Sequence, residues 1–387
     1  MRFDYEQTTK IFFGKGRMAE LPEIVAGYGK HVLLVTGNRT SSRGQIYQEL
    51  TEKFKEKGLA VTHYDGVFGN PTTDCVDEGV RAAKESGADV LVGFGGGSVM
   101  DSAKAIAVGA VNEGQAWDYL FFKNPQPTKI LPVIAVPTTS GTGSQVTQVA
   151  VMTETATNTK SAIFNNLLYP KVAVIDPELM ESMPSHITAS TGFDAFCHCF
   201  ESYINVKASP YTDMIALEGV KMIAKYLREA VRNGGDTEAR EKMAWADTCG
   251  GLAIANAGVT LPHGVGMTIS GHCPEILHGE SLALIYPSFM RFTYPHAIEK
   301  FARVGRIFNA ELAKVSDEEA AEMCCEEIDK LLQDIGMWIN FRQFGVDMDM
   351  LERIAKRSHD LPDYKSNPVI ADKEEIFREL KAGYERV

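Results

Sequence analysis

The sequence lacks the features that direct a chain into or across a membrane. No apolar run in its 387 residues approaches the ~20 that a membrane-spanning helix needs. The first positions, Met1 to Glu6, carry acids where a secretory signal peptide has an apolar core. The seven cysteines are an odd number without a CxxC pair, which indicates reduced thiols. We therefore expect a cytoplasmic protein.

An excess of positive charge is also absent. The formal net charge is −12 at pH 7, which argues against nonspecific binding to nucleic acids or anionic membranes, since both attract basic surfaces. The hydrophobic content of 44% and the charged content of 23% are ordinary for a globular protein. The length is sufficient for two domains, each with a substantial core.

The first half of the chain alternates short apolar runs with helical patterns. The predicted strands are residues 31–36, 59–64, 89–94, 130–136 and 172–175. Strands that are separated by helices predict a doubly wound, parallel α/β sheet. We assign this α/β domain to residues 1–182.

The second half of the chain has few β-branched runs, and residues 185–387 have the pattern of successive helices. We expect these helices to be broken near Pro210, residues 233–235, Pro262, Pro287, Pro295 and Gly336. The second domain, residues 183–387, is therefore predicted to be all-α.

A polar pair lies inside the first of these predicted helices. Asp194 and His198 are four residues apart, so both project from one face. Alone, such a pair is more typical of a core helix in which the two side chains bond to each other. His263 and His278 follow downstream, and one carboxylate with three imidazoles suits Fe(II) or Zn(II) better than calcium or magnesium. The four residues predict a metal site in the helical domain.

Two glycine-rich turns follow predicted strands. Residues 95–98 read GGGS after the third strand, and residues 137–145 combine glycines with hydroxyl groups after the fourth. Exposed backbone N–H groups at the start of a helix suit a pyrophosphate, and the carboxyl ends of parallel strands are where open sheets bind ligands. A lone GGGS turn is equally typical of a tight connection, and GxGxxG is absent after the first strand. Two such turns at one edge favour phosphate binding.

Five motifs together resemble the iron-containing (group III) alcohol dehydrogenase family. They are GGGSVMDSAK at 95–104, PTTSGTGSQ at 137–145, TGFDAFCHCFESY at 191–203, LPHG at 261–264 and LHGE at 277–280. The resemblance runs from about Phe3 to the final helix. It implies a dehydroquinate synthase-like architecture, a cleft between a dinucleotide domain and a helical metal domain, and a homodimer or higher homo-oligomer.

The resemblance also assigns roles to residues at matching motif positions. It implies that Fe(II), with Zn(II) as the alternative, is bound by Asp194, His198, His263 and His278. The expected NAD(P)(H)-binding set is Gly37, Asn38, Gly95, Gly96, Gly97, Ser98, Asp101, Thr138, Thr139 and Thr142.

Three departures from the family pattern affect these expectations. The second motif ends in Gln145 where family members usually have Glu, and Met267 stands where many members carry a further histidine. We therefore consider His272 as a candidate for proton exchange, with an exposed helix-end histidine as the equal alternative. Gly37 replaces the acid that often follows the first strand in NAD-dependent members. Arg39, Ser41, Ser42 and Arg43 follow it, which favours NADP(H) over NAD(H).

The expected activity is metal-dependent hydride transfer between NAD(P)(H) and a small primary alcohol or aldehyde, with aldehyde reduction as the physiological direction. A short uncharged aldehyde is favoured, and an aldehyde bearing a sulfonate, phosphonate or carboxylate is the alternative. A dehydroquinate synthase-like lyase is less favoured, because the segments around the metal ligands carry no basic residues for a phosphorylated substrate.

Overall fold

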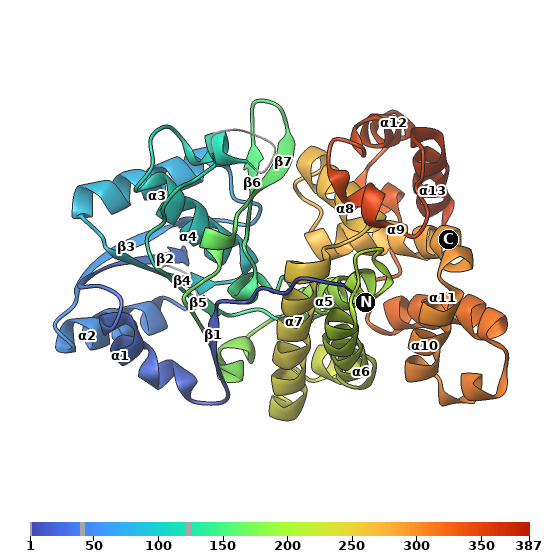
Figure 1. Cartoon of the computed structure of the whole chain (residues 1–387), viewed down its shortest axis with the longest axis horizontal. Helices are drawn as coiled ribbons and strands as arrows, with labels where there is room; N and C mark the ends of the chain where they lie inside the picture. The colour runs from blue at the N-terminus through green and yellow to red at the C-terminus, as the bar shows by residue number, and fades with distance from the viewer. Residues whose placement is uncertain (1, 39–42, 121–125) are drawn as a thin grey trace. The chain divides into compact units, whose positions relative to one another are not determined.

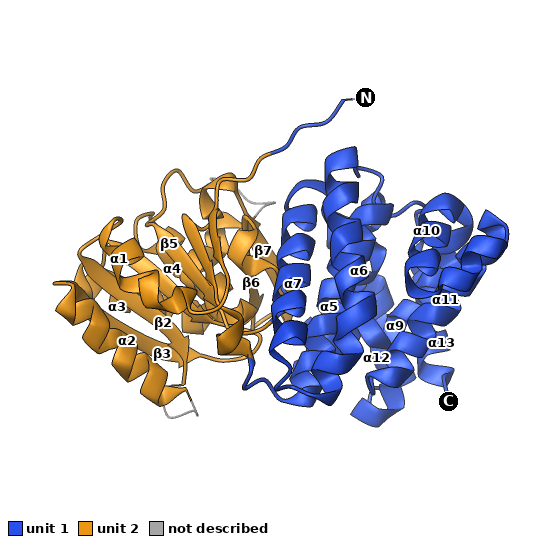
Figure 2. Ribbon diagram, turned by 90° about the horizontal axis from the view of Figure 1, so that it is seen from below, with its two compact units in different colours: residues 1–5, 140–142, 181–387 blue, residues 6–139, 143–180 orange. Residues whose placement is uncertain are grey.

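The computed structural model describes residues 2–38, 43–120 and 126–387. They form two compact units (Figure 2). The sheet unit comprises residues 6–139 and 143–180, and the helical unit comprises residues 1–5, 140–142 and 181–387. Within the described residues, no helix is long and apolar enough to cross a membrane.

Within the described part of the sheet unit, six strands form one sheet in which every pairing is parallel. The spatial order is β1-β8-β5-β4-β2-β3, and Figure 1 labels each of these strands except β8. The strands are β1 (Lys10–Phe13), β2 (His31–Gly37), β3 (Ala60–Val67), β4 (Val90–Gly95), β5 (Val133–Pro137) and β8 (Val172–Ile175). The predicted doubly wound parallel sheet is confirmed.

The central strands are largely apolar because helices cover both faces of the sheet. Successive residues of a strand point to opposite faces. On β2, Leu33 packs with α3 (Thr73–Ser86) and α4 (Gly97–Gly109), whereas Leu34 packs with α1 (Leu21–Ala26) and α2 (Gly44–Glu56). Both leucines are fully buried. Burial on both faces explains why these strands lack the polar alternation of a one-sided sheet.

Three strands were not expected from the sequence. β1 pairs with β8 at one edge of the sheet. Two further strands, β6 (Val149–Glu154) and β7 (Thr159–Phe164), form a separate antiparallel hairpin. The hairpin is anchored by Lys104, whose buried ammonium group donates to the Val149 carbonyl at 2.8 Å. β1 has four residues and pairs with a strand that is distant in sequence, whereas β6 and β7 pair locally across a short turn.

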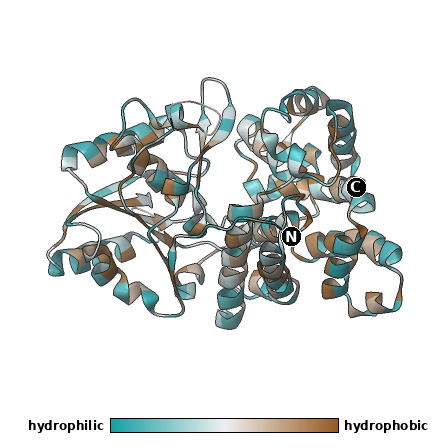
Figure 3. Cartoon of the chain, viewed as in Figure 1, coloured by the Kyte–Doolittle hydropathy of each residue, from teal (hydrophilic) through white to brown (hydrophobic). Residues whose placement is uncertain are grey.

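The helical unit confirms the predicted all-α second half. Its helices are α5 (Ser185–Ile204), α6 (Pro210–Arg232), α7 (Thr237–Ala257), α8 (Leu261–His272), α9 (His278–Thr293), α10 (Ile298–Phe308), α11 (Asp317–Asp334), α12 (Met348–Arg357) and α13 (Lys373–Glu385). The helices carry hydrophilic and hydrophobic bands (Figure 3), as amphipathic packing requires. The core is centred on α5, where the rings of Phe193 and Phe196 contact Tyr286 of α9.

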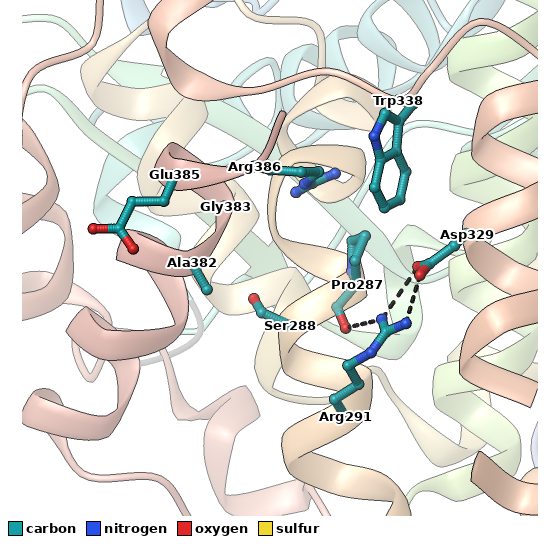
Figure 4. Close-up of a pocket in the computed structure, with 9 residues that line it drawn as sticks. All are labelled: Pro287, Ser288, Arg291, Asp329, Trp338, Ala382, Gly383, Glu385 and Arg386. Carbon is teal, nitrogen blue, oxygen red and sulfur yellow. Dashed lines mark hydrogen bonds and ion pairs between the residues drawn. The ribbon is translucent and has the colours of Figure 1, made fainter. Parts of the chain in front are cut away.

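The expected break at Pro287 is wrong, because α9 continues through this proline. Proline lacks an N–H group, so the carbonyl of Ala283, four residues earlier, loses its helical partner. Arg386 restores that hydrogen bond: its Nη1 donates to the Ala283 oxygen at 3.1 Å, and its Nη2 donates to the Leu284 oxygen. Figure 4 shows Arg386 near Pro287, with the Trp338 ring stacked 4.8 Å from the guanidinium carbon. A side chain distant in sequence thus keeps the helix intact.

Replacement of Arg386 by methionine should destabilise the helical unit by about 1–3 kcal/mol, because the Ala283 carbonyl is left without a partner. In a Pro287→Ala background the new N–H can bond to that carbonyl, so the same replacement should cost less. The measurement is a double-mutant cycle of unfolding free energies from urea denaturation. An equal cost of Arg386→Met in both backgrounds would show that Arg386 does not compensate for the proline.

Candidate functional site

Helix α5 supplies the first two predicted ligands. Pro184 is its N-cap residue, and the helix runs without interruption to Ile204. Asp194 and His198 therefore lie one turn apart on one face. Both are buried, and His198 Nε2 lies 3.8 Å from Asp194 Oδ1.

Helices α8 and α9 bring the other two histidines to the same carboxylate oxygen. The distance to Asp194 Oδ1 is 3.6 Å from His263 Nε2 and 3.7 Å from His278 Nε2. Asp194, His263 and His278 offer ligand atoms that all lie within 4.8 Å of one another. The His198 ring stacks on the His263 ring with centroids 4.6 Å apart. All four predicted ligands thus converge within the helical unit.

A close helix contact makes this convergence feasible. His278 is the first residue of α9, and Gly279 follows it. A Cβ atom on Gly279 would lie 2.0 Å from the Ser190 carbonyl oxygen of α5. Only glycine allows the start of α9 to approach α5 so closely, and this approach places His278 beside Asp194.

The electrostatics of the cluster suit a cation. Asp194 Oδ1 and His263 Nε2 are buried, and neither has a hydrogen-bond partner among the described residues. Burial raises the pKa of Asp194, but His198, His278 and His263 outweigh it and hold the pKa below its usual value. Burial lowers the pKa of His198 and favours its neutral, metal-binding form. One anionic oxygen with three imidazole nitrogens fits a divalent transition metal.

Two hydrogen bonds orient the buried imidazoles. His198 Nδ1 donates to the Gly141 carbonyl at 2.9 Å, so its Nε2 lone pair faces Asp194. His263 Nδ1 lies 2.7 Å from Glu201 Oε1, so the Nε2 atom of this ring also faces Asp194. Such partners of the second nitrogen set the tautomer of a ligand histidine and raise its basicity.

Glu201 is a site residue that the sequence analysis did not assign. It is fully buried, and its Oε2 accepts from the backbone N–H of Thr260 at 2.8 Å and from the Thr260 hydroxyl at 3.0 Å. Both carboxylate oxygens are thus occupied, one by the ligand histidine and one by the residue that precedes α8. The spacing of Asp194, His198 and Glu201 at i, i+4 and i+7 on α5 is the signal that would have revealed it.

The predicted cofactor residues gather at one edge of the sheet unit. Gly95 pairs with Pro137 in the register of β4 and β5, and Thr36, the neighbour of Gly37, pairs with Phe94. The carboxyl ends of β2, β4 and β5 therefore lie side by side, as at the ligand-binding edge of doubly wound sheets. The turn after β4 leads into α4, whose N-cap is Gly96.

The hydroxyl-rich turn lies against the glycine turn. The Thr138 N–H donates to the Gly95 carbonyl at 2.9 Å, and a Cβ atom on Gly96 would lie 3.3 Å from Thr139 Oγ1. Thr138 Oγ1 is buried, and it has no hydrogen-bond partner among the described residues. A helix start, small residues and an unused hydroxyl are compatible with a bound dinucleotide phosphate.

Other members of the predicted set are placed differently. Asp101 uses its carboxylate within the protein: Ser144 donates to Oδ1 at 2.6 Å and the Val151 N–H donates to Oδ2 at 3.1 Å. It therefore holds the hairpin and the turn rather than offering a free oxygen. Thr142 belongs to the helical unit.

The loop after β2 is described only in part. Asn38 is exposed, and Gly97 and Ser98 begin α4. Arg43 donates to the Leu179 carbonyl at 3.3 Å, and burial lowers its pKa. The remaining residues of the expected phosphate-binding group, Arg39, Ser41 and Ser42, lie outside the described residues.

His272 is the last residue of α8, and His263 lies in the first turn of the same helix. It is half-buried, and its Nδ1 lies 3.0 Å from the Thr268 carbonyl, which leaves Nε2 as the basic nitrogen. Nine residues of α-helix separate the two histidines by about 13 Å along the axis. His272 and His263 therefore face different surroundings.

Family models match both halves of the chain. The model described as "Iron-containing alcohol dehydrogenase" covers residues 8–177. The model described as "Fe-containing alcohol dehydrogenase family, C-terminal" covers residues 188–384.

The names of similar proteins include several different alcohols. The chain is 35% identical to choline dehydrogenase of Bacillus subtilis (strain 168), over 94% of this chain and 90% of that protein. It is 33% identical to the NAD-dependent methanol dehydrogenase of Bacillus methanolicus, over 95% and 96% of the two chains. A solved 1,3-propanediol oxidoreductase superposes with a TM-score of 0.94 at 32% identity, over 99% of this chain and 100% of that one.

Substitution of Glu201 by glutamine should weaken metal binding about 10- to 100-fold, because the charge that supports His263 is removed while the shape is kept. Competition with a chromogenic chelator measures this affinity. The matched control is Glu327→Gln, which alters another buried glutamate of the helical unit, bonded to Asn309 and Lys330. Equal affinities in the two variants would contradict the role of Glu201.

Proposed function

Because the chain belongs to the iron-containing alcohol dehydrogenase family, we propose that it is a metal-dependent oxidoreductase of small primary alcohols and aldehydes. Hydride passes between the substrate and NAD(P)(H), and aldehyde reduction is the physiological direction. The architecture is the dehydroquinate synthase-like fold of that family. The observation that carries the proposal is the buried convergence of three histidine nitrogens on Asp194 Oδ1.

Asp194, His198, His263 and His278 would hold the metal, with Fe(II) favoured over Zn(II). When bound, the metal supplies Lewis-acid chemistry toward a substrate oxygen, and the nicotinamide accepts or supplies the hydride. The unused buried atoms of Asp194 and His263 support this assignment.

The chain's own groups have distinct tasks in this proposal. Glu201 and the Gly141 carbonyl hold the Nδ1 protons of His263 and His198, so both rings present their Nε2 atoms to the same point. Asp194 is 3% exposed, so the fold of the helical unit keeps water from its carboxylate. The His278 side chain is 25% exposed, so the cluster opens on the side of α9.

The sheet unit would bind the dinucleotide at the turns after β2, β4 and β5. The name of the methanol dehydrogenase relative supports a nicotinamide cofactor. Gly37 lacks a carboxylate that would repel a 2′-phosphate, which supports a preference for NADP(H). His272 would exchange protons with solvent at the end of α8, through its basic Nε2 atom.

Removal of one ligand tests the proposed function. Asp194→Ala should lose bound metal and aldehyde reduction, because the only carboxylate of the predicted four-ligand set is gone, while affinity for the dinucleotide is retained in the sheet unit. Metal content is measured by atomic spectroscopy, and dinucleotide binding by nicotinamide fluorescence. Full turnover by metal-free wild-type protein would refute metal dependence.

Cofactor preference is tested at Gly37. A Cβ atom there would lie 3.6 Å from the Val67 carbonyl oxygen, an ordinary contact, so a side chain can be accommodated. Gly37→Asp should lower kcat/KM for NADPH while sparing NADH, because the new carboxylate repels the 2′-phosphate. The loss corresponds to about 1–3 kcal/mol of transition-state stabilisation with NADPH. Gly37→Asn is the uncharged control. A parent enzyme that already prefers NADH would overturn the preference for NADP(H).

A further inference from the structure

Asp363 is an acidic residue beside the ligand cluster that none of the motifs contains. It lies in the short 3-10 helix η9 (Pro362–Ser366) and is half-buried. A Cβ atom on Gly264, the residue after His263, would lie 3.4 Å from both Cβ and Oδ2 of Asp363. The Asp363 side chain thus packs against the backbone of a turn that carries a predicted ligand.

The charges of the site act on this carboxyl group. Burial raises the pKa of Asp363 to about 6, His263 opposes the shift, and Glu201 adds to it. Asp363 therefore belongs to the same electrostatic neighbourhood as the ligand histidine and its supporting glutamate.

Asp363 differs from Glu201 and Asp101, whose carboxylates are bonded to other residues. Glu201 accepts three hydrogen bonds, and Asp101 is bonded to Ser144 and Val151. Apart from its own backbone N–H, no described residue forms a hydrogen bond or ion pair with the Asp363 side chain, and the N-cap of η9 is Leu361 rather than Asp363. Neither Asp363 oxygen is among the buried atoms that lack a partner, so the half-buried carboxylate is open to solvent and to a donor from a ligand.

We propose that Asp363 selects substrates that carry a second hydrogen-bond donor, such as a hydroxyl group, and rejects substrates that carry a negative charge. The inference rests on the proposed function, and it narrows the substrate class. A hydroxyl group can donate to the carboxylate, whereas a sulfonate or carboxylate would be repelled. Family membership does not decide the substrate class, because the names of the relatives include substrates as different as methanol, choline and 1,3-propanediol. The alternative of an anionic aldehyde is thereby disfavoured.

The test compares aldehydes that differ in one group. Propionaldehyde, its 2-hydroxy and 3-hydroxy derivatives, and the anionic sulfoacetaldehyde are reduced by the wild type, Asp363→Ala and Asp363→Asn. The wild type should favour one hydroxylated aldehyde over propionaldehyde in kcat/KM. Asp363→Ala should lower that preference about 10-fold or more, since it removes the acceptor. Asp363→Asn, which removes only the charge, should raise kcat/KM for sulfoacetaldehyde about 10-fold.

The matched control is Asp360→Asn, which removes an exposed carboxylate three residues away that pairs with Arg357. It should leave every ratio unchanged. Metal content and thermal midpoint are measured for each variant, so that loss of the site is distinguished from loss of selectivity. If the wild type reduces these aldehydes but both Asp363 variants keep its ratios within twofold, the inference is overturned. If the wild type reduces no aldehyde with either nicotinamide cofactor, the proposed function fails and the inference with it.

Discussion

The burial of one ionised carboxylate is the constraint on which the helical unit depends. An isolated buried charge costs several kcal/mol, and Asp194 is 3% exposed. Three imidazoles approach one of its oxygens within 3.6 to 3.8 Å, from three different helices. This requirement explains why α9 begins with a histidine and a glycine, and why the outer nitrogens of the His198 and His263 rings are held by a backbone carbonyl and by Glu201.

The sheet unit meets a different requirement. Its central strands are buried on both faces, so polar groups are displaced to the strand ends, where glycine and hydroxyl residues lie in register. Beneath these turns, Lys104 and Asp101 form a buried pair with Ser144. Burial lowers the pKa of Lys104 to about 8, although Asp101 opposes the shift. The pair joins α4 to the hairpin and so fixes both the glycine turn and the hydroxyl-rich turn.

The acids near the ligand cluster illustrate how environment separates chemical roles. Asp194 faces imidazoles, and these hold its pKa low against burial. Glu201 is fully buried, and both of its oxygens are bonded within the protein. It therefore orients the predicted ligand His263 and does not bind a metal or substrate itself. Asp363 is half-buried and is bonded to no other described residue, which is why we assign it the contact with substrate. The difference between these side chains lies in their partners, because all three are carboxylates.

The features that the sequence alone determined are those with a local signal. Apolar runs of strand length, the i, i+4 pair on α5 and the glycine turns have fixed spacing, so they revealed the sheet, the helical half and the candidate ligands. Only the tertiary structure decided the features that depend on distant partners. The attachment of the β6–β7 hairpin to α4 involves Lys104, the continuity of α9 through Pro287 depends on Arg386, and the role of Glu201 depends on a histidine 62 residues away. Asp363 gave no signal because its significance comes from proximity to His263 and from the lack of a bond to another described residue. Neither is encoded in local spacing, since both arise only when η9 packs against α8.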